Sequence, residues 1–292
     1  MVITHNRPGH LDDLIGTSLL AHSHCLDVAF RSPQGMTESD FRNYTVDVGG
    51  RYDPARGWFD HHHDSDLPCA AHLVAAHCHP EEFSKVCKMR AWRFMDIQDR
   101  CGRDAAVKST REKINESTRV TEGDLLFVSP CAEVGQAIVR AIFNPDVCYL
   151  YASFIAAIWY SLPEKIVLAA TAEAAARVAA EDVAIAEADL RTVIIGDKAV
   201  VIAVTDAPLR AGRFFSSGKG ACVALLITHN EIGGAGAVMT RADRFKDKLD
   251  LRGLVDRMEM NGLCPTFIHA SGFCAAFNAA PADVAAAVHY FG

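Results

Sequence analysis

Short apolar segments that alternate with helical segments constrain the fold of this chain more than any other feature. Strands are predicted at Val2–Thr4, Leu26–Phe30 and Tyr44–Val48, with a helix over Leu14–Ala21 between the first two. Strands that alternate with helices in this way favour an α/β fold with a largely parallel sheet. From Ala70 to about Ala188 the pattern becomes mostly helical.

The character of the sequence changes after about residue 190. Arg191–Val204 is typical of a strand, a turn and a second strand, and Cys222–Thr228 is another apolar run rich in strand-forming residues. Pro281–Tyr290 is predicted to close the chain as a helix. We therefore predict two domains, an α/β domain over residues 1–189 and a smaller α+β domain over residues 190–292.

Composition places the chain among globular proteins, since half of its 292 residues are apolar. No apolar run reaches the roughly 20 residues that span a bilayer, so we expect no membrane partner. The N-terminus lacks the features of a signal peptide, and the ten cysteines are scattered without C-x-x-C spacing. We expect free thiols, no structural zinc, and an intracellular, by default cytoplasmic, protein.

The net charge of −7 provides no global basic field, so a nucleic-acid partner would require a local basic patch. The densest basic run comprises Lys85, Lys88, Arg90, Arg93, Arg100 and Arg103. A solvated helix face is the alternative interpretation of this run. The sequence leaves the oligomeric state open.

Histidine is distributed unevenly, with ten of the 13 residues before Pro80. The first cluster lies between a predicted strand and a predicted helix and contains His5, His10, Asp12 and Asp13. Ligands bind at the carboxyl ends of strands in open α/β sheets, and imidazoles with carboxylates suit Zn²⁺, Mn²⁺ or Fe²⁺. Capping of the following helix by one of the aspartates is the alternative.

Two further clusters follow predicted strands. Asp47 lies at an apolar strand end before two glycines, where a buried carboxylate needs a cation or donors; an ordinary turn aspartate is the alternative. The run WFDHHHDSD places Asp60, His61 and His62 after an apolar lead-in. One imidazole can bind metal while the next faces a substrate. A wholly solvated polar loop is the alternative interpretation.

The fourth cluster contains Asp96 and Asp99, which share one face if the segment is helical. A surface pair beside arginines is the alternative. Together the clusters supply enough ligands for two divalent ions, an arrangement suited to in-line attack on phosphorus. The sequence contains no P-loop, no G-x-S-x-G elbow and no G-x-G-x-x-G fingerprint.

These stretches, in this order, resemble the DHH phosphoesterase superfamily, and within it the Myg-type exonuclease family. HNRPGHLDD resembles the family's H-N-G-x-F-H-x-D-E, VDVGGRYD resembles V-D-V-G-G-x-Y-D, and FDHHH resembles Y-D-H-H-Q. MDIQDRCG resembles I-D-A-I-D-N-G, and FIHASGFCAAFNAA resembles a run V-H-A-S-G-F-I-G-G near the family's end. The departures are an arginine and a proline in the first motif, Arg100 in the fourth, and alanines after Phe273.

The resemblance implies a role for each matched residue. The implied metal ligands are His5, His10, Asp12, Asp47, His61 and Asp99. The implied catalytic residues are Asp47, as the bridging carboxylate, His62, which contacts the scissile phosphate, and Asp60, which orients its neighbours. The substrate-binding residues that we predict are His269, Ser271 and Gly272, with Arg100 from the basic run.

The resemblance further implies a DHH-type first domain that holds two divalent ions, most readily Mn²⁺ with Mg²⁺ as the other choice, and a second domain that closes over the substrate. The implied activity is that of a metal-dependent 3′–5′ exonuclease on RNA or short oligonucleotides. The family also admits a nuclear or mitochondrial location. A small-molecule phosphohydrolase of pyrophosphatase or nucleotide-phosphate type, and a non-catalytic metal-stabilised binding protein, are the alternatives.

Overall fold

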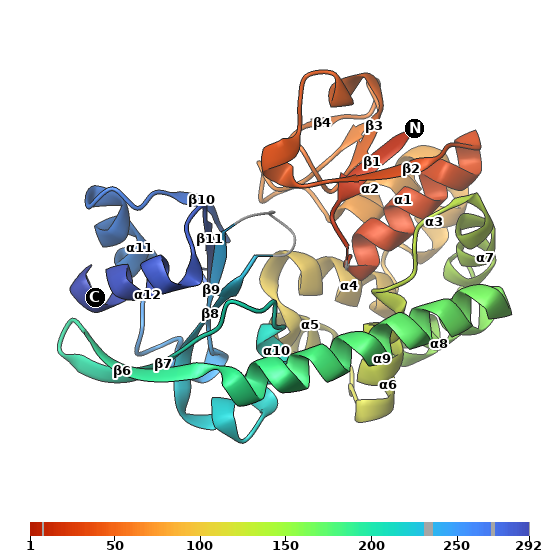
Figure 1. Cartoon of the computed structure of the whole chain (residues 1–292). Coiled ribbons are helices and arrows are strands. Elements are labelled where there is room, and N and C mark those ends of the chain that lie inside the picture. The colour runs from red at the N-terminus through yellow and green to blue at the C-terminus, as the bar shows by residue number, and fades with distance from the viewer. Residues whose placement is uncertain (8, 231–235, 270–271, 292) are drawn as a thin grey trace. The chain divides into compact units, whose positions relative to one another are not determined.

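Packing divides the chain into two units, Met1–Ala175 and Ala176–Gly292. The computed structural model describes residues 1–7, 9–230, 236–269 and 272–291 (Figure 1). The division falls inside the long helix α9 (Glu164–Glu187). The boundary predicted between residues 189 and 190 corresponds to the end of that helix and stays a prediction.

Unit 1 holds a five-stranded sheet with the order β2-β1-β3-β5-β4. Its strands are β1 (Val2–His5), β2 (Val28–Arg31), β3 (Tyr44–Val46), β4 (Tyr52–Asp53) and β5 (Trp58–Phe59). The pairs β1–β2, β1–β3 and β3–β5 are parallel, and only β4 pairs antiparallel, with β5. The predicted mostly parallel first sheet is therefore confirmed.

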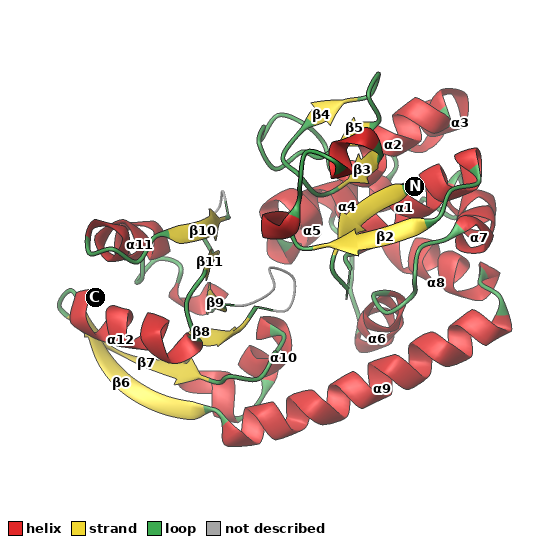
Figure 2. Cartoon of the chain, turned by 45° about the horizontal axis from the view of Figure 1, so that its top comes forward, coloured by secondary structure: helices red, strands yellow, loops and turns green. Residues whose placement is uncertain are grey.

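Most other regular structure of unit 1 is helical, and Figure 2 draws these helices in red. They are α1 (Leu11–His24), α2 (Ala70–Cys78), α3 (Pro80–Val86), α4 (Arg90–Cys101), α5 (Arg103–Thr110), α6 (Glu116–Leu125), α7 (Ala132–Ile142), α8 (Tyr151–Ser161) and the first part of α9. The core that they share includes the fully buried Ile15, Phe59, Trp92 and Phe154. Helix α1 lies at the centre of this packing, against β1, α2 and α7.

Close contact between α1 and α7 depends on Gly135. A Cβ at this position would lie 2.1 Å from the backbone oxygen of Ser18 and 2.6 Å from the Cβ of His22. We expect Gly135→Ala to lower the free energy of unfolding by about 1–3 kcal/mol or more, because the two helices must move apart. Denaturant titration checks this. Gly212→Ala, with nothing within 4 Å of the added Cβ, is the control and should not destabilise.

The described residues of unit 2 form a six-stranded sheet with the order β10-β11-β9-β8-β7-β6, and among these strands only β7 and β8 pair parallel. Its strands are β6 (Asp189–Ile195), β7 (Lys198–Val204), β8 (Val223–His229), β9 (Ala237–Arg241), β10 (Pro265–Ile268) and β11 (Cys274–Phe277). Its helices are α10 (Ala211–Ser216), α11 (Leu251–Met260) and α12 (Pro281–Phe291). The predicted α+β character of this part is confirmed.

The C-terminal part of α9 belongs to unit 2 because of its packing. Ala184 and Ala188 are buried in a small cluster with Phe214. The carboxylate of Glu181 is fully buried and accepts hydrogen bonds from Arg210 Nε and Nη2 at 2.8 and 2.7 Å. Residues of this one helix therefore belong to both units.

Among the described residues, no single helix has the length and apolar character to cross a membrane. Only α8 and α9 taken together meet that criterion, and they are bent by 115° relative to each other.

Candidate metal centre

Parallel pairing of three strands brings the first histidine and aspartate clusters together. His5 is the last residue of β1, Asp47 follows β3, and His61 comes two residues after β5. Because β1, β3 and β5 run in the same direction, their carboxyl ends meet at one edge of the sheet. This is where open α/β sheets bind ligands.

Asp47 has an unusual backbone conformation, with a φ of 56°. Its backbone N–H donates to Phe59 O at 3.0 Å, and the residue is 3% exposed. Left-handed backbone is costly for most residues but tolerated by aspartate and asparagine. The turn directs the Asp47 carboxylate back among the histidines.

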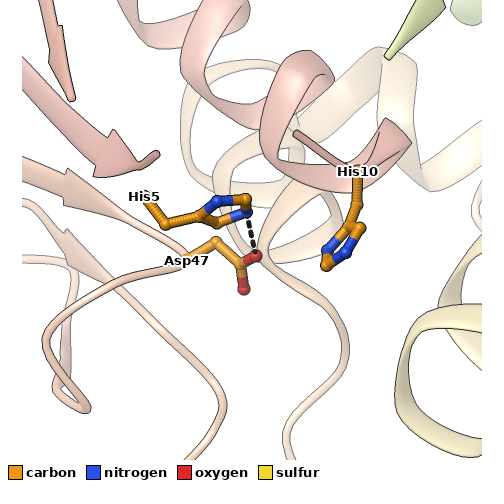
Figure 3. Close-up of side chains that lie close together, drawn as sticks. All are labelled: His5, His10 and Asp47. Atoms are coloured by element: carbon orange, nitrogen blue, oxygen red, sulfur yellow. Dashed lines mark ion pairs between the residues drawn. The ribbon is translucent and has the colours of Figure 1, made fainter. Parts of the chain in front are cut away.

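The two oxygens of Asp47 face different imidazoles. Oδ2 lies 3.5 Å from His5 Nε2, and Oδ1 lies 3.3 Å from His61 Nε2. Asp47 thus belongs to two groups of candidate ligands, one with His5 and His10 (Figure 3) and one with His61 and His62, each with ligand atoms within 4.8 Å of one another. A shared carboxylate of this kind is the arrangement expected of a bridging ligand.

A third group joins His10 and Asp12 to Asp99 of α4. Asp12 lies in the first turn of α1 and is 1% exposed, and neither of its carboxylate oxygens accepts a hydrogen bond from the described residues. The residue at the N-cap of α1 is His10, so helix capping does not account for the aspartate. A buried carboxylate without donors is expensive unless a cation meets it.

The electrostatics of this centre indicate a deficit of positive charge. Burial raises the pKa of Asp12 well above its usual range, and the charges of Asp47 and Asp99 raise it further. Burial lowers the pKa of His5, but the carboxylates of Asp13 and Asp47 outweigh this and raise it to about 10. His61 behaves alike, since Asp47 and Asp99 overcome the effect of burial and raise its pKa to about 10.

These residues fit divalent cations. The orphaned oxygens of Asp12, together with buried atoms of His5, Asp47 and His61 that lack hydrogen-bond partners among the described residues, converge on one region. Imidazole nitrogens mixed with several carboxylates suit Mn²⁺ and related ions. The predicted ligands His5, His10, Asp12, Asp47, His61 and Asp99 all fall within the three groups.

Asp60 holds His62 in place. Its Oδ1 lies 2.7 Å from His62 Nδ1 and accepts the backbone N–H of His62 at 2.9 Å, while Oδ2 accepts the N–H of Gly50 at 2.7 Å. Asp60 is 2% exposed, but the side chain of His62 is 43% exposed. Because Nδ1 faces Asp60, the Nε2 edge is the one that would meet a substrate.

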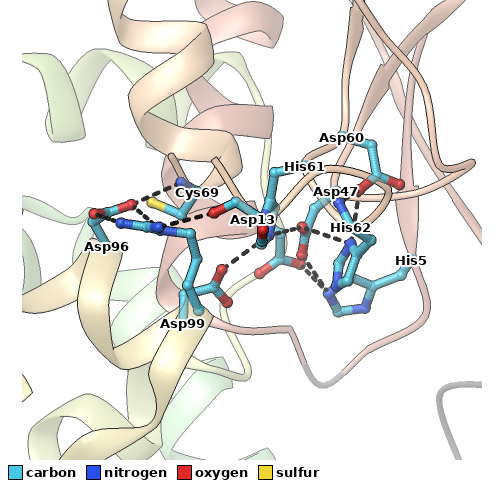
Figure 4. A network of polar contacts seen from close by, with 11 residues as sticks. His5, Asp13, Asp47, Asp60, His61, His62, Cys69, Asp96 and Asp99 are labelled. Carbon is cyan, nitrogen blue, oxygen red and sulfur yellow. Dashed lines mark hydrogen bonds and ion pairs between the residues drawn. The ribbon is translucent and has the colours of Figure 1, made fainter. Parts of the chain in front are cut away.

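Asp13 belongs to the centre, although it was not among the predicted ligands. Its Oδ2 lies 3.2 Å from His5 Nε2, and it appears beside His61 and Asp47 in Figure 4. A Cβ at Gly9 would lie 2.5 Å from Asp13 Oδ2, so the glycine leaves space for this carboxylate. The neighbouring Arg7 adds no cation to the ligand groups, since Nη2 donates to Phe127 O and to Glu173 Oε2.

The basic run does not form a continuous patch of unpaired cations. Arg100 forms a bidentate pair with Asp96, Arg103 pairs with Glu122 at 2.9 Å, and Arg90 lies 3.8 Å from Glu112. Asp96 is 9% exposed and bonds Cys69 as well as Arg100, so Asp96 and Asp99 are not a solvated surface pair. A substrate contact by Arg100 stays a prediction.

The predicted phosphate contacts of unit 2 lie in the turn between β10 and β11. The N–H of His269 donates to Cys274 O at 3.0 Å, and the N–H of Gly272 donates to His269 O at 2.8 Å. Gly272 has a φ of 67°, which favours glycine. Ser271 lies outside the described residues. Their contacts with substrate stay predictions.

Fold and site define an α/β protein with a buried histidine–aspartate centre suited to divalent cations. The model of the family MYG1_exonuc, described as "Uncharacterised protein family (UPF0160)", matches residues 1–68, which contain the first three motifs. The match covers only this first part of the chain, and there it agrees with the resemblance that the sequence motifs indicate.

A solved structure titled "Member of s1p family of ribosomal proteins PF0399 DHH domain" is similar over 98% of this chain and 85% of that chain, with 13% identity and a TM-score of 0.43. No curated protein matches this chain significantly.

Proposed function

We propose that this protein is a divalent-metal-dependent phosphodiesterase that shortens RNA or short oligonucleotides from the 3′ end. The observation that carries the proposal is the position of Asp47, whose two oxygens face the imidazoles of two separate ligand groups. Two bound divalent cations, Mn²⁺ or Mg²⁺, would activate water and neutralise charge on the phosphate. The name of the matching family model supports an exonuclease.

The residues around that centre have separate proposed roles. His5, His10, Asp12, His61 and Asp99 would hold the cations with Asp47. Asp60 fixes the orientation of His62, whose partly exposed imidazole would donate to a non-bridging phosphate oxygen as negative charge develops there. His269, Ser271 and Gly272 are proposed to hold a substrate phosphate, and an intracellular location belongs to the same proposal.

The test is hydrolysis of a 5′-labelled short RNA with added Mn²⁺, comparing the wild type with His62→Ala. We expect a ladder that shortens from the 3′ end in the wild type, and a rate lower by about 10²–10³-fold in the variant, the cost of losing one preorganised charge stabiliser. His63→Ala, a change of the exposed neighbour, should retain the wild-type rate.

Other outcomes would support other functions. Turnover of pyrophosphate or of phosphorylated nucleotides, without shortening of RNA, would replace the proposal with a small-molecule phosphohydrolase. Bound Mn²⁺ with no turnover of any of these substrates would favour a binding role. Equal rates of RNA shortening by His62→Ala and the wild type would contradict the role assigned to His62.

A further inference from the structure

Arg100 and Asp96 form a bidentate ion pair on helix α4, and each side chain also bonds the backbone of the segment that follows His61. We propose that Asp96 and Arg100 are positioning residues that hold His61 and Asp99 at metal-ligating distance from each other. This inference rests on the metal centre of the proposed function. It assigns Arg100 a role different from the substrate contact predicted from its charge.

The contacts of the pair reach the loop at two points. Arg100 Nε and Nη2 donate to Asp96 Oδ1 and Oδ2 at 2.9 and 2.6 Å, and Nη1 donates to Ser65 O at 3.3 Å. Asp96 Oδ1 also accepts the backbone N–H of Cys69 at 2.9 Å. The pair therefore fixes both Ser65 and Cys69, which enclose the loop segment just after the histidines.

The same helix carries a candidate ligand. Asp99 comes three residues after Asp96, and residues three apart lie on one side of a helix. Its Oδ2 lies 2.9 Å from His61 Nε2 (Figure 4). Any sliding of the loop along α4 would change this distance, and the pair prevents such sliding.

The bidentate geometry explains why charge alone would not replace the arginine. A planar guanidinium with two parallel hydrogen bonds fixes orientation as well as distance, and an ammonium does not. The side chains of Asp96 and Arg100 are only 13% and 27% exposed, so water screens the pair weakly. Outer residues that orient metal ligands in this way commonly control metal affinity.

The first test is Arg100→Lys in the full chain, with Mn²⁺ binding measured by calorimetry and RNA hydrolysis measured separately. We expect Mn²⁺ affinity to fall by about 10–100-fold, while KM for RNA at saturating Mn²⁺ stays unchanged. A substrate contact would instead leave Mn²⁺ affinity unchanged, and KM would rise only as far as lysine fails to replace the bidentate contact of arginine with phosphate. Arg93→Lys, at an exposed position on the same helix, is the matched control and should change neither quantity.

The second test is Asp96→Asn, alone and combined with Arg100→Lys. Asparagine can still accept the Cys69 N–H but loses the charged bidentate pair. We expect Asp96→Asn to weaken Mn²⁺ binding to a similar degree. The double variant should bind Mn²⁺ no more weakly than either single variant, because the effects of two substitutions within one network are not additive.

Unchanged Mn²⁺ affinity in Arg100→Lys would overturn the inference, whether KM rises or only the stability of the metal-free protein falls. If the wild type binds Mn²⁺ but leaves RNA intact, the exonuclease proposal fails while the affinity comparison still decides the role of the pair. If the wild type binds no Mn²⁺, the inference fails together with the metal centre.

Discussion

Asp47→Asn is expected to lower Mn²⁺-dependent hydrolysis of RNA by at least about 10³-fold, the upper range for loss of a principal electrostatic stabiliser. The carboxylate faces both His5 and His61. An amide offers one oxygen and no charge, so it cannot bridge two cations. We therefore expect the variant to lose tight binding of at least one of the two Mn²⁺ ions.

Asparagine is the correct replacement because of the backbone at this position. The φ of 56° is left-handed, and asparagine tolerates it, whereas alanine there would add strain of roughly 1–2 kcal/mol. A loss of activity in Asp47→Ala would therefore mix chemistry with folding. The hydrogen bond from the Asp47 N–H to Phe59 O involves only backbone and persists in the variant.

Mn²⁺ stoichiometry and initial hydrolysis rates measure this prediction. Asp64→Asn is a suitable control, because Asp64 is exposed and its Oδ1 accepts the N–H of Asp66 at 2.9 Å, a bond that asparagine can also accept. Two tightly bound Mn²⁺ ions and a wild-type rate in Asp47→Asn would refute the bridging role.

Mn²⁺ is expected to stabilise the protein by roughly 5 kcal/mol when two ions are each present at 100 times their dissociation constant, since each contributes about 2.7 kcal/mol. The physical reason is the buried negative charge of Asp12, Asp13, Asp47 and Asp99, which no lysine or arginine among the described residues neutralises by an ion pair within 4.0 Å. Thermal unfolding with Mn²⁺ and with excess chelator measures the effect.

Asp12→Asn should separate the cost of a buried carboxylate in the metal-free protein from the contribution of that carboxylate to Mn²⁺ binding. In the chelator-treated protein we expect the variant to be more stable than the wild type, because burial and the charges of Asp47 and Asp99 disfavour the Asp12 carboxylate. With Mn²⁺ the order should reverse, because a ligand is missing.

Asp53→Asn, at the edge strand β4, serves as the control and should leave the Mn²⁺ effect unchanged. Equal stabilisation of Asp12→Asn and the wild type by Mn²⁺ would remove Asp12 from the ligand set.

Local sequence patterns were sufficient for much of the architecture. Apolar runs at Val2–Thr4 and Arg191–Val204 predicted strands that the structure contains, and the helical pattern from Ala70 to Ala188 corresponds to α2 through α9. Strand and helix periods are properties of neighbouring residues. The strand-end positions of His5, Asp47 and His61 likewise followed from the alternation of strands and helices, because parallel strands align their carboxyl ends.

Contacts between distant segments were not available from those patterns. The left-handed turn at Asp47, the place of Asp13 beside His5, and the pairing of Arg100 with Asp96 each required the packed structure. The sequence by itself determined which side chains could bind cations and which elements would carry them, because residue chemistry and hydrophobic period are local. Only the tertiary structure decided which of them meet, because distances across the sheet edge and α4 depend on how the whole of unit 1 packs.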